Sequence, residues 1–349
     1  MTAKTEHSDG IVTIITRTRK RNIFLRRAIE SVLSQTYEAW HHIIINDGGD
    51  PIAVEALMQD YLVDYDKRFE LIHFEDARGM QFALNTGLQR AKTEFLAVHD
   101  DDDSWAPEFL EKTVGFLQEQ GRTSKYQGVV AQTVKIIEDI DEGDRIVENK
   151  RLPHIPLDEI NLFRIGYENP FPPIAFLYRK KIHDTVGYIE EKYDLVADMD
   201  FNIRFLCHFE IGLLHEPLAF YHVRESAHDP AFFNSVTAAT TKHRQLFNEL
   251  INNYLRHSDD ETLRHVGQSL NHARYLVDIH WRVVEIFKLM TLEASGSSAS
   301  EVEAVCDKIL SRQFTLMKKQ LTDHFDSKFE EFERNLNTQF QAVVEQMKK

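Results

Sequence analysis

Short apolar runs alternate with amphipathic segments over the first hundred residues of the chain. The runs are rich in isoleucine, valine and phenylalanine, as strands buried on both faces are, and they occupy residues 11–16, 42–45, 69–74 and 95–98. Between them, apolar positions recur at helical spacing in residues 24–33, 52–62 and 81–91. This order predicts an α/β domain whose parallel sheet is covered by helices and binds its ligands where the strands end.

The pattern changes beyond about residue 230, where long helical periods begin. Residues 240–254 and 263–292 are predicted helices, and the small residues 294–300 are a predicted linker. Large apolar residues then recur in steps of three and four: Leu321, Phe325, Phe329, Phe332, Leu336, Phe340, Val343 and Met347. The stripe indicates a coiled-coil seam or an amphipathic helix lying on a membrane. Its acidic polar face favours self-association into a homo-oligomer, or docking onto a partner's helix.

These patterns divide the chain into five predicted segments. With 349 residues, 42% of them hydrophobic, it is long enough for one sizeable core and an appendage. The segments are a flexible N-terminus (1–10), an α/β domain (11–230), a helical extension (231–293), a linker (294–300) and an amphipathic, coiled-coil-like helix (301–349).

Composition and charge exclude several classes of function. The net charge of −15 and the lack of a basic stripe argue against a nucleic-acid partner. The two cysteines, Cys207 and Cys306, lie far apart, which suits a reducing compartment and gives neither a disulfide framework nor a zinc motif. The sequence shows no signal-peptide pattern and no apolar run long enough for a transmembrane segment. We expect a cytoplasmic protein whose membrane contact, at the inner face, is peripheral.

Four consecutive aspartates, residues 100–103, follow the fourth predicted strand. Carboxylates this close together repel each other, and oxygen ligands of this kind suit Mg²⁺ or Mn²⁺, which are often shared with substrate phosphates. On the cluster alone, an acidic cap for the helix that begins near Pro107, with Asp103 or Ser104 as N-cap, is an equal alternative.

Two further groups stand where strands end. Asp47 closes the second strand, and the glycines after it permit a tight turn. Because the carboxyl ends of parallel strands meet at one edge, we expect Asp47 and residues 100–103 to face the same crevice. The loop at residues 17–21 carries four basic side chains, for which solvated surface charge is the simplest interpretation.

The order of these motifs resembles the family 2 glycosyltransferases, nucleotide-sugar-dependent enzymes of the GT-A fold, over about residues 11–228. The matching segments are residues 31–37 (SVLSQTY), 45–50 (INDGGD), 85–87 (NTG) and 100–107 (DDDDSWAP). The resemblance implies a GT-A, Rossmann-like, mostly parallel sheet flanked by helices, here with a helical C-terminal extension. It also implies that Asp47 hydrogen-bonds the nucleotide base, that Asp100 and Asp102 flank the family's DXD motif, and that Asp102 ligates Mn²⁺ or Mg²⁺.

The chain departs from the family pattern near the expected nucleotide. Residues 16–20 read TRTRK where the family carries Pro-x-Tyr-Asn, and Asn46 replaces the first of two common aspartates, which leaves the base preference open. Leu84 stands where an arginine is common, so a phosphate contact is expected from elsewhere. The nucleotide-binding candidates are Thr16, Arg17, Arg19, Asp47, Arg78, Asp100 and Asp101.

A second chemical cluster lies in residues 193–205, which are predicted to be a loop that enters a helix. Family members show Glu-Asp-x-Asp and a later arginine where this chain has residues 197–200 (ADMD) and Arg204. The resemblance therefore implies that Asp198 is the catalytic base, which removes the acceptor's proton in an inverting transfer. Asp200 and Arg204, four residues apart on a helix, predict an ordinary ion pair.

Two other segments correspond to ligand-facing regions of the family. The loop at residues 167–176, with three prolines, is expected to face the acceptor, although such loops are more often simple connections. Residues 220–229 correspond to a mobile region over the diphosphate. There His222 is a candidate metal ligand, and Arg224 and His228 are candidate phosphate or acceptor contacts together with Trp105.

The sequence thus predicts a metal-dependent, inverting glycosyltransferase. It moves a sugar from a UDP- or dTDP-type nucleotide-sugar donor to a glycan or lipid-linked saccharide acceptor in surface polysaccharide synthesis. One alternative is a catalytically inactive GT-A scaffold acting through its C-terminal helix, against which the presence of Asp47, Asp102 and Asp198 argues. The other is a sugar-phosphate nucleotidyltransferase, which is expected to carry a glycine-rich loop where residues 17–21 contain no glycine.

Overall fold

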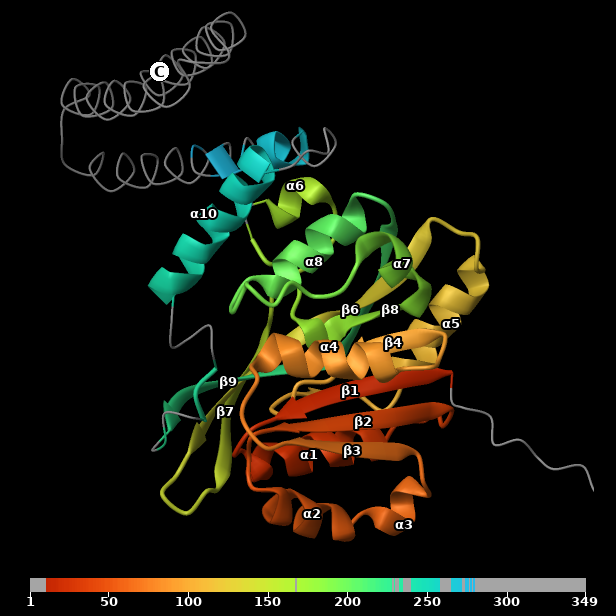
Figure 1. The fold of residues 1–349 in the computed structure, drawn as a ribbon, viewed down its shortest axis with the longest axis vertical. Helices are drawn as coiled ribbons and strands as arrows, with labels where there is room; N and C mark the ends of the chain where they lie inside the picture. Colours follow the sequence, from red (N-terminus) through yellow and green to blue (C-terminus); the bar gives the residue numbers. More distant parts are fainter. Residues whose placement is uncertain are drawn as a thin grey trace, which may run out of the picture. The chain divides into compact units, whose positions relative to one another are not determined.

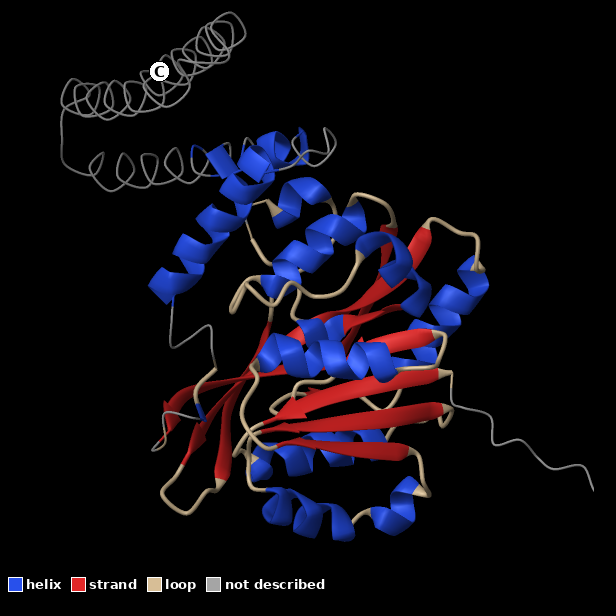
Figure 2. Cartoon of the chain, in the orientation of Figure 1, coloured by secondary structure: helices blue, strands red, loops and turns tan. Residues whose placement is uncertain are grey.

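The computed structural model describes residues 11–166, 168–227, 229, 232–234, 240–257, 265–271, 274, 275, 277 and 279. In this part of the chain, nine strands form one mixed sheet in the order β3-β2-β1-β4-β8-β6-β9-β5, and β7 pairs with β6 beside that path. Helices flank the sheet (Figures 1 and 2). The predicted α/β class is confirmed.

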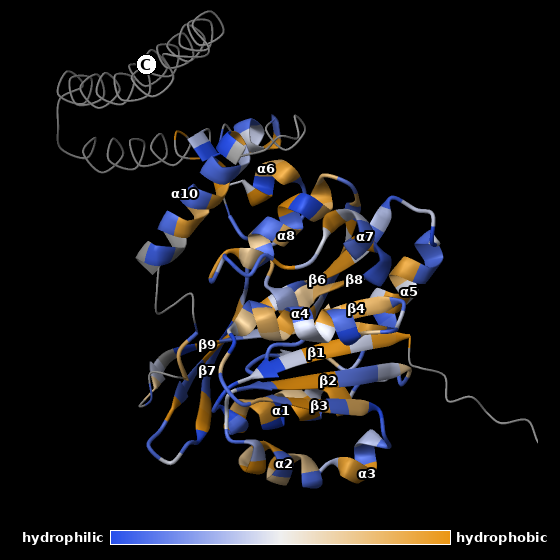
Figure 3. Ribbon diagram, in the orientation of Figure 1, coloured by the Kyte–Doolittle hydropathy of each residue, from blue (hydrophilic) through white to orange (hydrophobic). Residues whose placement is uncertain are grey.

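The first half of the sheet is parallel. β1 (Val12–Thr18) lies between β2 (Trp40–Asp47) and β4 (Phe95–Val98), and β3 (Phe69–Phe74) forms the edge beside β2. With a paired strand along each edge and helices packed against it, β1 is buried along most of its length. Figure 3 shows β1 changing from hydrophobic to hydrophilic toward its carboxyl end. The parallel pairing brings the ends of β1, β2 and β4 to one edge, as predicted.

The helices α1 (Asn22–Leu33), α2 (Pro51–Gln59), α3 (Leu62–Tyr65) and α4 (Met80–Arg90) connect these strands. α4 packs on β1 and β2 so closely that a Cβ at Gly87 would lie 2.5 Å from Cγ2 of Ile15. The single helix predicted over residues 52–62 is instead broken between α2 and α3. Tyr61, at the break, donates its hydroxyl to Glu30 of α1 at 2.8 Å, and this contact favours the interruption.

The second half of the sheet is mixed. β8 (Phe176–Arg179) runs antiparallel between β4 and the long strand β6 (Tyr126–Ile140), and β9 (Glu210–Ala227) runs parallel to β6. The short β5 (Ser104–Trp105) pairs antiparallel with β9, and β7 (Ile146–Pro153) forms a hairpin with β6. This hairpin has no counterpart in the sequence prediction.

The remaining helices lie between and after these strands. They are α5 (Phe109–Gln120), α6 (Leu162–Ile165), α7 (His183–Val186), α8 (Ala197–Leu206), α10 (Thr240–His257) and the 3₁₀ turns η1 (Pro173–Ala175) and η2 (Lys180–Ile182). α10 covers the predicted helix at residues 240–254 and is joined to α8 by a 2.9 Å hydrogen bond from the Tyr254 hydroxyl to Asp200. Of the predicted helix at 263–292, residues 265–271 are helical.

The chain divides into two compact units, residues 1–274 and 275–349. The predicted flexible N-terminus, the linker at 294–300 and the amphipathic helix at 301–349 lie outside the described residues. The five predicted segment boundaries therefore stay predictions. Among the helices that the structure describes, none combines the length and the apolar character that crossing a membrane requires.

Candidate active site

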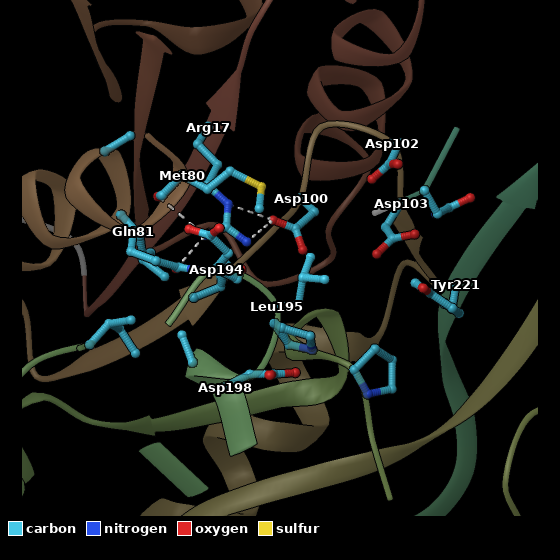
Figure 4. A pocket seen from close by; sticks show the side chains of 18 of the residues that line it. Arg17, Met80, Gln81, Asp100, Asp102, Asp103, Asp194, Leu195, Asp198 and Tyr221 are labelled. Carbon is cyan, nitrogen blue, oxygen red and sulfur yellow. Dashed lines mark hydrogen bonds and ion pairs between the residues drawn. The ribbon is translucent and has the colours of Figure 1, made fainter. Parts of the chain in front are cut away.

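A cavity of about 810 Å³ lies beside the carboxyl ends of β1, β2 and β4. Its walls also include the loop before α4, the proline-rich loop before β8 and the start of α8. Of the predicted site residues, the structure brings six to this cavity: Arg17, Arg19, Asp47, Asp100, Asp102 and Asp198. Figure 4 shows Asp100, Asp102 and Asp103 on one side of it and Asp198 on another. The crevice expected from the strand ends is therefore present.

The turn at residues 100–103, called the aspartate turn from here on, is held in place by contacts with buried groups of the protein. Asp103 is 1% exposed, and its Oδ1 accepts a 2.9 Å hydrogen bond from the backbone N–H of His222 on β9. Burial raises the pKa of the Asp103 carboxyl well above its usual range. Asp101 is fully buried and paired with Arg21, and burial raises its pKa to about 6 against the opposing effect of that guanidinium. Asp101 and Asp103 are thus structural supports of the turn.

Asp102 is held by two guanidinium groups. Its Oδ2 accepts from Arg21 at 3.4 Å and from Arg224, which is fully buried. Although burial works in the opposite direction, these two cations keep the pKa of Asp102 below its ordinary value. Asp102 is therefore ionised, with its Oδ1 accepting no hydrogen bond from the described residues.

Arg224 and His222 belong to a buried network rather than to the cavity wall. His222 Nδ1 lies 2.9 Å from Oε2 of Glu138, and its Nε2 lies 2.9 Å from Oγ of Ser104. Arg224 also lies 3.5 Å from Glu138, whose carboxylate accepts a 2.8 Å hydrogen bond from Arg27. Burial opposes ionisation of Glu138, but the hydrogen bonds from His222 and Arg27 lower its pKa to about 2. Both ring nitrogens of His222 are thus engaged within the protein.

The basic segment of residues 17–21, which the structure places at the end of β1 and in the loop after it, contributes to the cavity in two ways. Arg17 reaches across to Asp100, with Nε 3.1 Å from Oδ1, and its NH1 donates to the backbone oxygen of Met80 at 3.3 Å (Figure 4). Arg19 and Lys20 are exposed at the cavity and form no ion pair with the described residues. Two cationic side chains are therefore available to a ligand.

Asp47 lies at the end of β2 and fixes the loop that precedes α4. Its Oδ1 accepts the N–H of Arg78 at 2.6 Å, and its Oδ2 accepts the N–H of Gly79 at 3.0 Å. Gly79 has φ of 98°, a left-handed conformation that glycine adopts without strain. The side chain of Arg78 stacks on Phe82, with 4.0 Å between the guanidinium carbon and the ring centroid. Asp47 thus shapes the wall that it lines.

Two other predicted residues lie away from the cavity wall. Thr16 is fully buried and donates its hydroxyl to the backbone oxygen of His99 at 2.8 Å. Trp105 is 4% exposed, stacks on Phe109 at 4.4 Å and donates its indole N–H to Ile174 at 2.6 Å. His228 lies outside the described residues.

Asp198 enters the cavity from the first turn of α8. Its Oδ1 accepts the N–H of Met199 at 2.9 Å, and its Oδ2 accepts Nδ2 of Asn169 at 2.6 Å. Two residues further along, Asp200 and Arg204 form the predicted ion pair at 2.7 Å, which is confirmed. The sequence prediction did not single out Asn169, which lies in the proline-rich loop and lines the cavity with Asp198.

The donors at the aspartate turn suit a hard divalent cation. The cavity receives carboxylate oxygens from Asp100 and Asp102, and each residue keeps one oxygen that accepts no hydrogen bond from the described residues. The described residues contain no group of three or more histidine, cysteine or acidic side chains arranged around a common metal position. Oxygens from outside the chain, such as ligand phosphates and water, would complete the coordination shell.

Comparisons with known proteins agree with this geometry. The sequence profile of Glycosyl transferase family 2 matches residues 13–187, half of the chain. A Bacillus subtilis protein that carries the name teichuronic acid biosynthesis glycosyltransferase TuaG is 28% identical over 118 residues, which are 34% of this chain and 46% of that protein. The O-antigen biosynthesis glycosyltransferase WbnJ of Escherichia coli is 24% identical over 190 residues, 53% of this chain and 70% of WbnJ. The chain thus spans about half of TuaG and slightly more than two thirds of WbnJ.

Two solved structures share the fold. The crystal structure of S. aureus TarS 1–349 in complex with UDP-GlcNAc has a TM-score of 0.56 and 17% identity, covering 74% of this chain and 70% of that one. The mannosyltransferase PcManGT from Pyrobaculum calidifontis, in complex with GDP-Man and Mn²⁺, has a TM-score of 0.55 and 13% identity, covering 90% and 86%. Both similarities concern the fold alone.

Proposed function

Because the chain belongs to glycosyl transferase family 2, we propose that its cavity transfers a sugar from a nucleoside-diphosphate sugar to a hydroxyl group of a glycan or lipid-linked saccharide. One observation carries the proposal. The aspartate turn after β4 and the carboxylate of Asp198 on α8 line the same cavity. A donor bound at the aspartate turn therefore faces a base at Asp198. The names of TuaG and WbnJ support a place in surface polysaccharide synthesis.

The donor is proposed to lie along the ends of β1, β2 and β4. Asp47 and the loop it fixes receive the base, and Arg19 and Lys20 lie where they can pair with phosphate oxygens. We propose a UDP or dTDP donor. TarS was solved with UDP-GlcNAc and PcManGT with GDP-Man, so the shared fold accommodates more than one base.

Asp102, helped by Asp100, would hold Mn²⁺ or Mg²⁺ against the diphosphate. When bound, such a cation neutralises the negative charge that accumulates on the departing nucleoside diphosphate. The PcManGT complex with Mn²⁺ supports this cofactor class. Arg21 and Arg224 keep the Asp102 carboxylate ionised and oriented, which is the form that a cation needs.

Asp198 is proposed to act as the general base. The oxygen of the acceptor hydroxyl forms a bond to the anomeric carbon on the face opposite the diphosphate, and the hydroxyl proton passes to the Asp198 carboxylate. The bond between the anomeric carbon and the diphosphate oxygen breaks, and its electron pair leaves with the nucleotide. Attack from the opposite face inverts the configuration of the sugar.

Calorimetric titration tests the donor assignment. The full chain would be titrated with UDP, dTDP, GDP and their sugars, first with Mn²⁺ and then with EDTA. We expect tight binding of a pyrimidine nucleotide that EDTA abolishes, and slow release of nucleotide from its sugar in the presence of methyl glycosides. Absence of binding to every nucleotide would refute the proposal, and preference for GDP would refute the donor class alone.

A further inference from the structure

Asn169 lies beside the proposed base and is tied to it directly. Its Nδ2 is 2.6 Å from Oδ2 of Asp198, and both residues line the cavity. The orientation of the amide is settled by chemistry, because an ionised carboxylate only accepts hydrogen bonds and only the nitrogen of the amide can donate one. The other carboxylate oxygen of Asp198 is held by the N–H of Met199. Side chain and backbone thus grip the carboxylate from two directions.

The carbonyl end of the Asn169 amide lacks the hydrogen bonds that a buried oxygen needs. Oδ1 of Asn169 is buried and accepts no hydrogen bond from the described residues. A buried carbonyl oxygen without a partner lowers the stability of a fold, so it calls for an explanation other than folding. Buried polar groups that lack a hydrogen-bond partner are often found at functional sites.

We propose that Asn169 is a positioning residue for the catalytic base, and that it holds Asp198 at a cost to the stability of the fold. The inference rests on the role proposed above for Asp198. The amide N–H binds Oδ2 and fixes the rotation of the carboxylate, so that the base keeps one orientation toward the acceptor hydroxyl. Asn169 itself exchanges no proton with the acceptor.

The proposal predicts different effects on the unfolding midpoint and on kcat, whereas loss of a residue that serves only packing would lower both. Replacement of Asn169 by alanine removes both the hydrogen bond to Asp198 and the unsatisfied oxygen. We expect the unfolding midpoint of Asn169→Ala to equal or exceed that of the wild type. We expect kcat for nucleotide release to fall about 100-fold, as for other misplaced catalytic groups. The donor's Kd should be unchanged, because the residue lies on the Asp198 side of the cavity.

The chain offers a matched control. Asn149 on β7 also donates its amide to an aspartate, Asp139, at 2.6 Å, but at an exposed site outside the cavity. Asn149→Ala removes the same type of contact and should leave both kcat and donor affinity at wild-type values. If Asn149→Ala and Asn169→Ala reduce kcat equally, the effect is not specific to the base and the proposal fails.

A second variant tests the hydrogen bond itself. Asn169→Asp keeps the shape of the side chain but places a second carboxyl group against Asp198. Near neutral pH the two carboxylates repel, whereas at lower pH they share one proton, which restores a donor to Oδ2. We expect the activity of Asn169→Asp, relative to that of the wild type at the same pH, to rise as the pH falls from about 8 to about 5.5. Parallel pH profiles of the two proteins would contradict the proposal.

The assay uses UDP-GlcNAc, UDP-glucose, UDP-galactose and dTDP-glucose with Mn²⁺. It measures the nucleotide that is released when the sugar is transferred to water or to a methyl glycoside. An Asn169→Ala variant that turns over as fast as an active wild type overturns the inference and leaves the proposed function standing. A destabilised Asn169→Ala variant also overturns it, because the residue would then serve folding. A wild type that neither binds nor cleaves any donor refutes the proposed function, and the inference falls with it.

Discussion

The guanidinium of Arg224 on β9 is fully buried and hydrogen-bonded to the carboxylate of Asp102, in the turn after β4. The same side chain donates to the backbone oxygens of Phe232 at 2.8 Å and His222 at 3.1 Å. The proposed metal ligand is therefore fixed by a strand that is more than a hundred residues away in the sequence.

Removal of Arg224 should destabilise the fold strongly. In Arg224→Gln, Asp102 and Glu138 lose a buried counter-ion, and breaking a buried pair typically costs about 3–5 kcal/mol. Urea denaturation followed by circular dichroism would measure the loss. Arg145→Gln is the control, because Arg145 pairs with Asp141 at an exposed turn and its removal should leave the midpoint unchanged. Similar midpoints for the two variants would argue against a structural role for the buried pair.

Asp102→Asn should abolish metal-dependent binding of the donor. An amide is a much weaker ligand for Mg²⁺ or Mn²⁺ than a carboxylate, yet it still accepts a hydrogen bond from Arg224. Titration with the preferred nucleotide should give the same low affinity in Mn²⁺ and in EDTA. Asp60→Asn, at the exposed end of α2, should retain the difference between the two conditions. Full metal dependence in Asp102→Asn would remove Asp102 from the metal site.

Asp198→Asn should separate binding from turnover. The variant keeps the shape of the side chain but has no basic oxygen, so we expect kcat to fall roughly 10²- to 10⁴-fold while the donor's Kd stays close to the wild-type value. Steady-state nucleotide release and calorimetry measure the two quantities on the same preparation. An active Asp198→Asn enzyme would exclude this residue as the base.

Two glycines should respond oppositely to alanine. At Gly87 a Cβ would lie 2.5 Å from Ile15 and 3.2 Å from Ile45, so Gly87→Ala should destabilise the protein by about 1–3 kcal/mol. At Gly115, within α5, a Cβ meets no atom within 4 Å, and Gly115→Ala should stabilise by about 0.5–1 kcal/mol through helix propensity. Thermal denaturation of both variants checks the close approach of α4 to β1. Equal shifts would contradict it.

Stability should also decline in mild acid through His42. This side chain is fully buried between Thr16 and Tyr65, and burial lowers the pKa of its imidazole well below 6.5. The unfolded chain takes up the proton first, so stability is complete above about pH 7 and falls as the pH drops below about 6.5. The slope approaches about 1.4 kcal/mol per pH unit for this one proton.

Comparison with a variant isolates this contribution. His42→Gln cannot titrate and should make the decline of unfolding free energy between about pH 7.5 and 5.5 less steep by the share of one proton, measured by urea denaturation. His215→Gln, at an exposed site on β9, should keep the wild-type slope. If both variants match the wild type, the buried imidazole is not the group responsible.

The sequence was sufficient to place the proposed donor residues. Asp47 and the turn at residues 100–103 follow strands that are apolar enough to recognise, and adjacent parallel strands must end at the same edge. Asp198 came from the resemblance to the family, not from any periodic pattern. The position of Asp198 at the same cavity depends on the loop before α8, whose sequence has no periodic pattern.

The buried network could not be predicted, because it depends on strand pairing. His222 and Arg224 alternate with Val223 on β9, and in the parallel register with β6 Glu138 stands opposite Arg224. Neither the existence of β6 nor this register follows from local pattern, so both residues were predicted to face the ligand. Asn169 was missed for a similar reason, since its contact with Asp198 joins a proline-rich loop to a helix 29 residues later.

Because β8 lies between β4 and β6, the strands can join the sheet only in a certain order as the chain is synthesised. A ribosome that adds about 5–20 residues per second completes the β3-β2-β1-β4 block first, and β6 then emerges with no pairing partner among the described strands already made. Residues 176–179 must arrive before β6 can join the sheet, and β9 follows later still. During that interval Asp102 lacks the buried guanidinium of Arg224 and keeps only its contact with Arg21, so the turn at residues 100–103 carries more uncompensated negative charge until β9 docks.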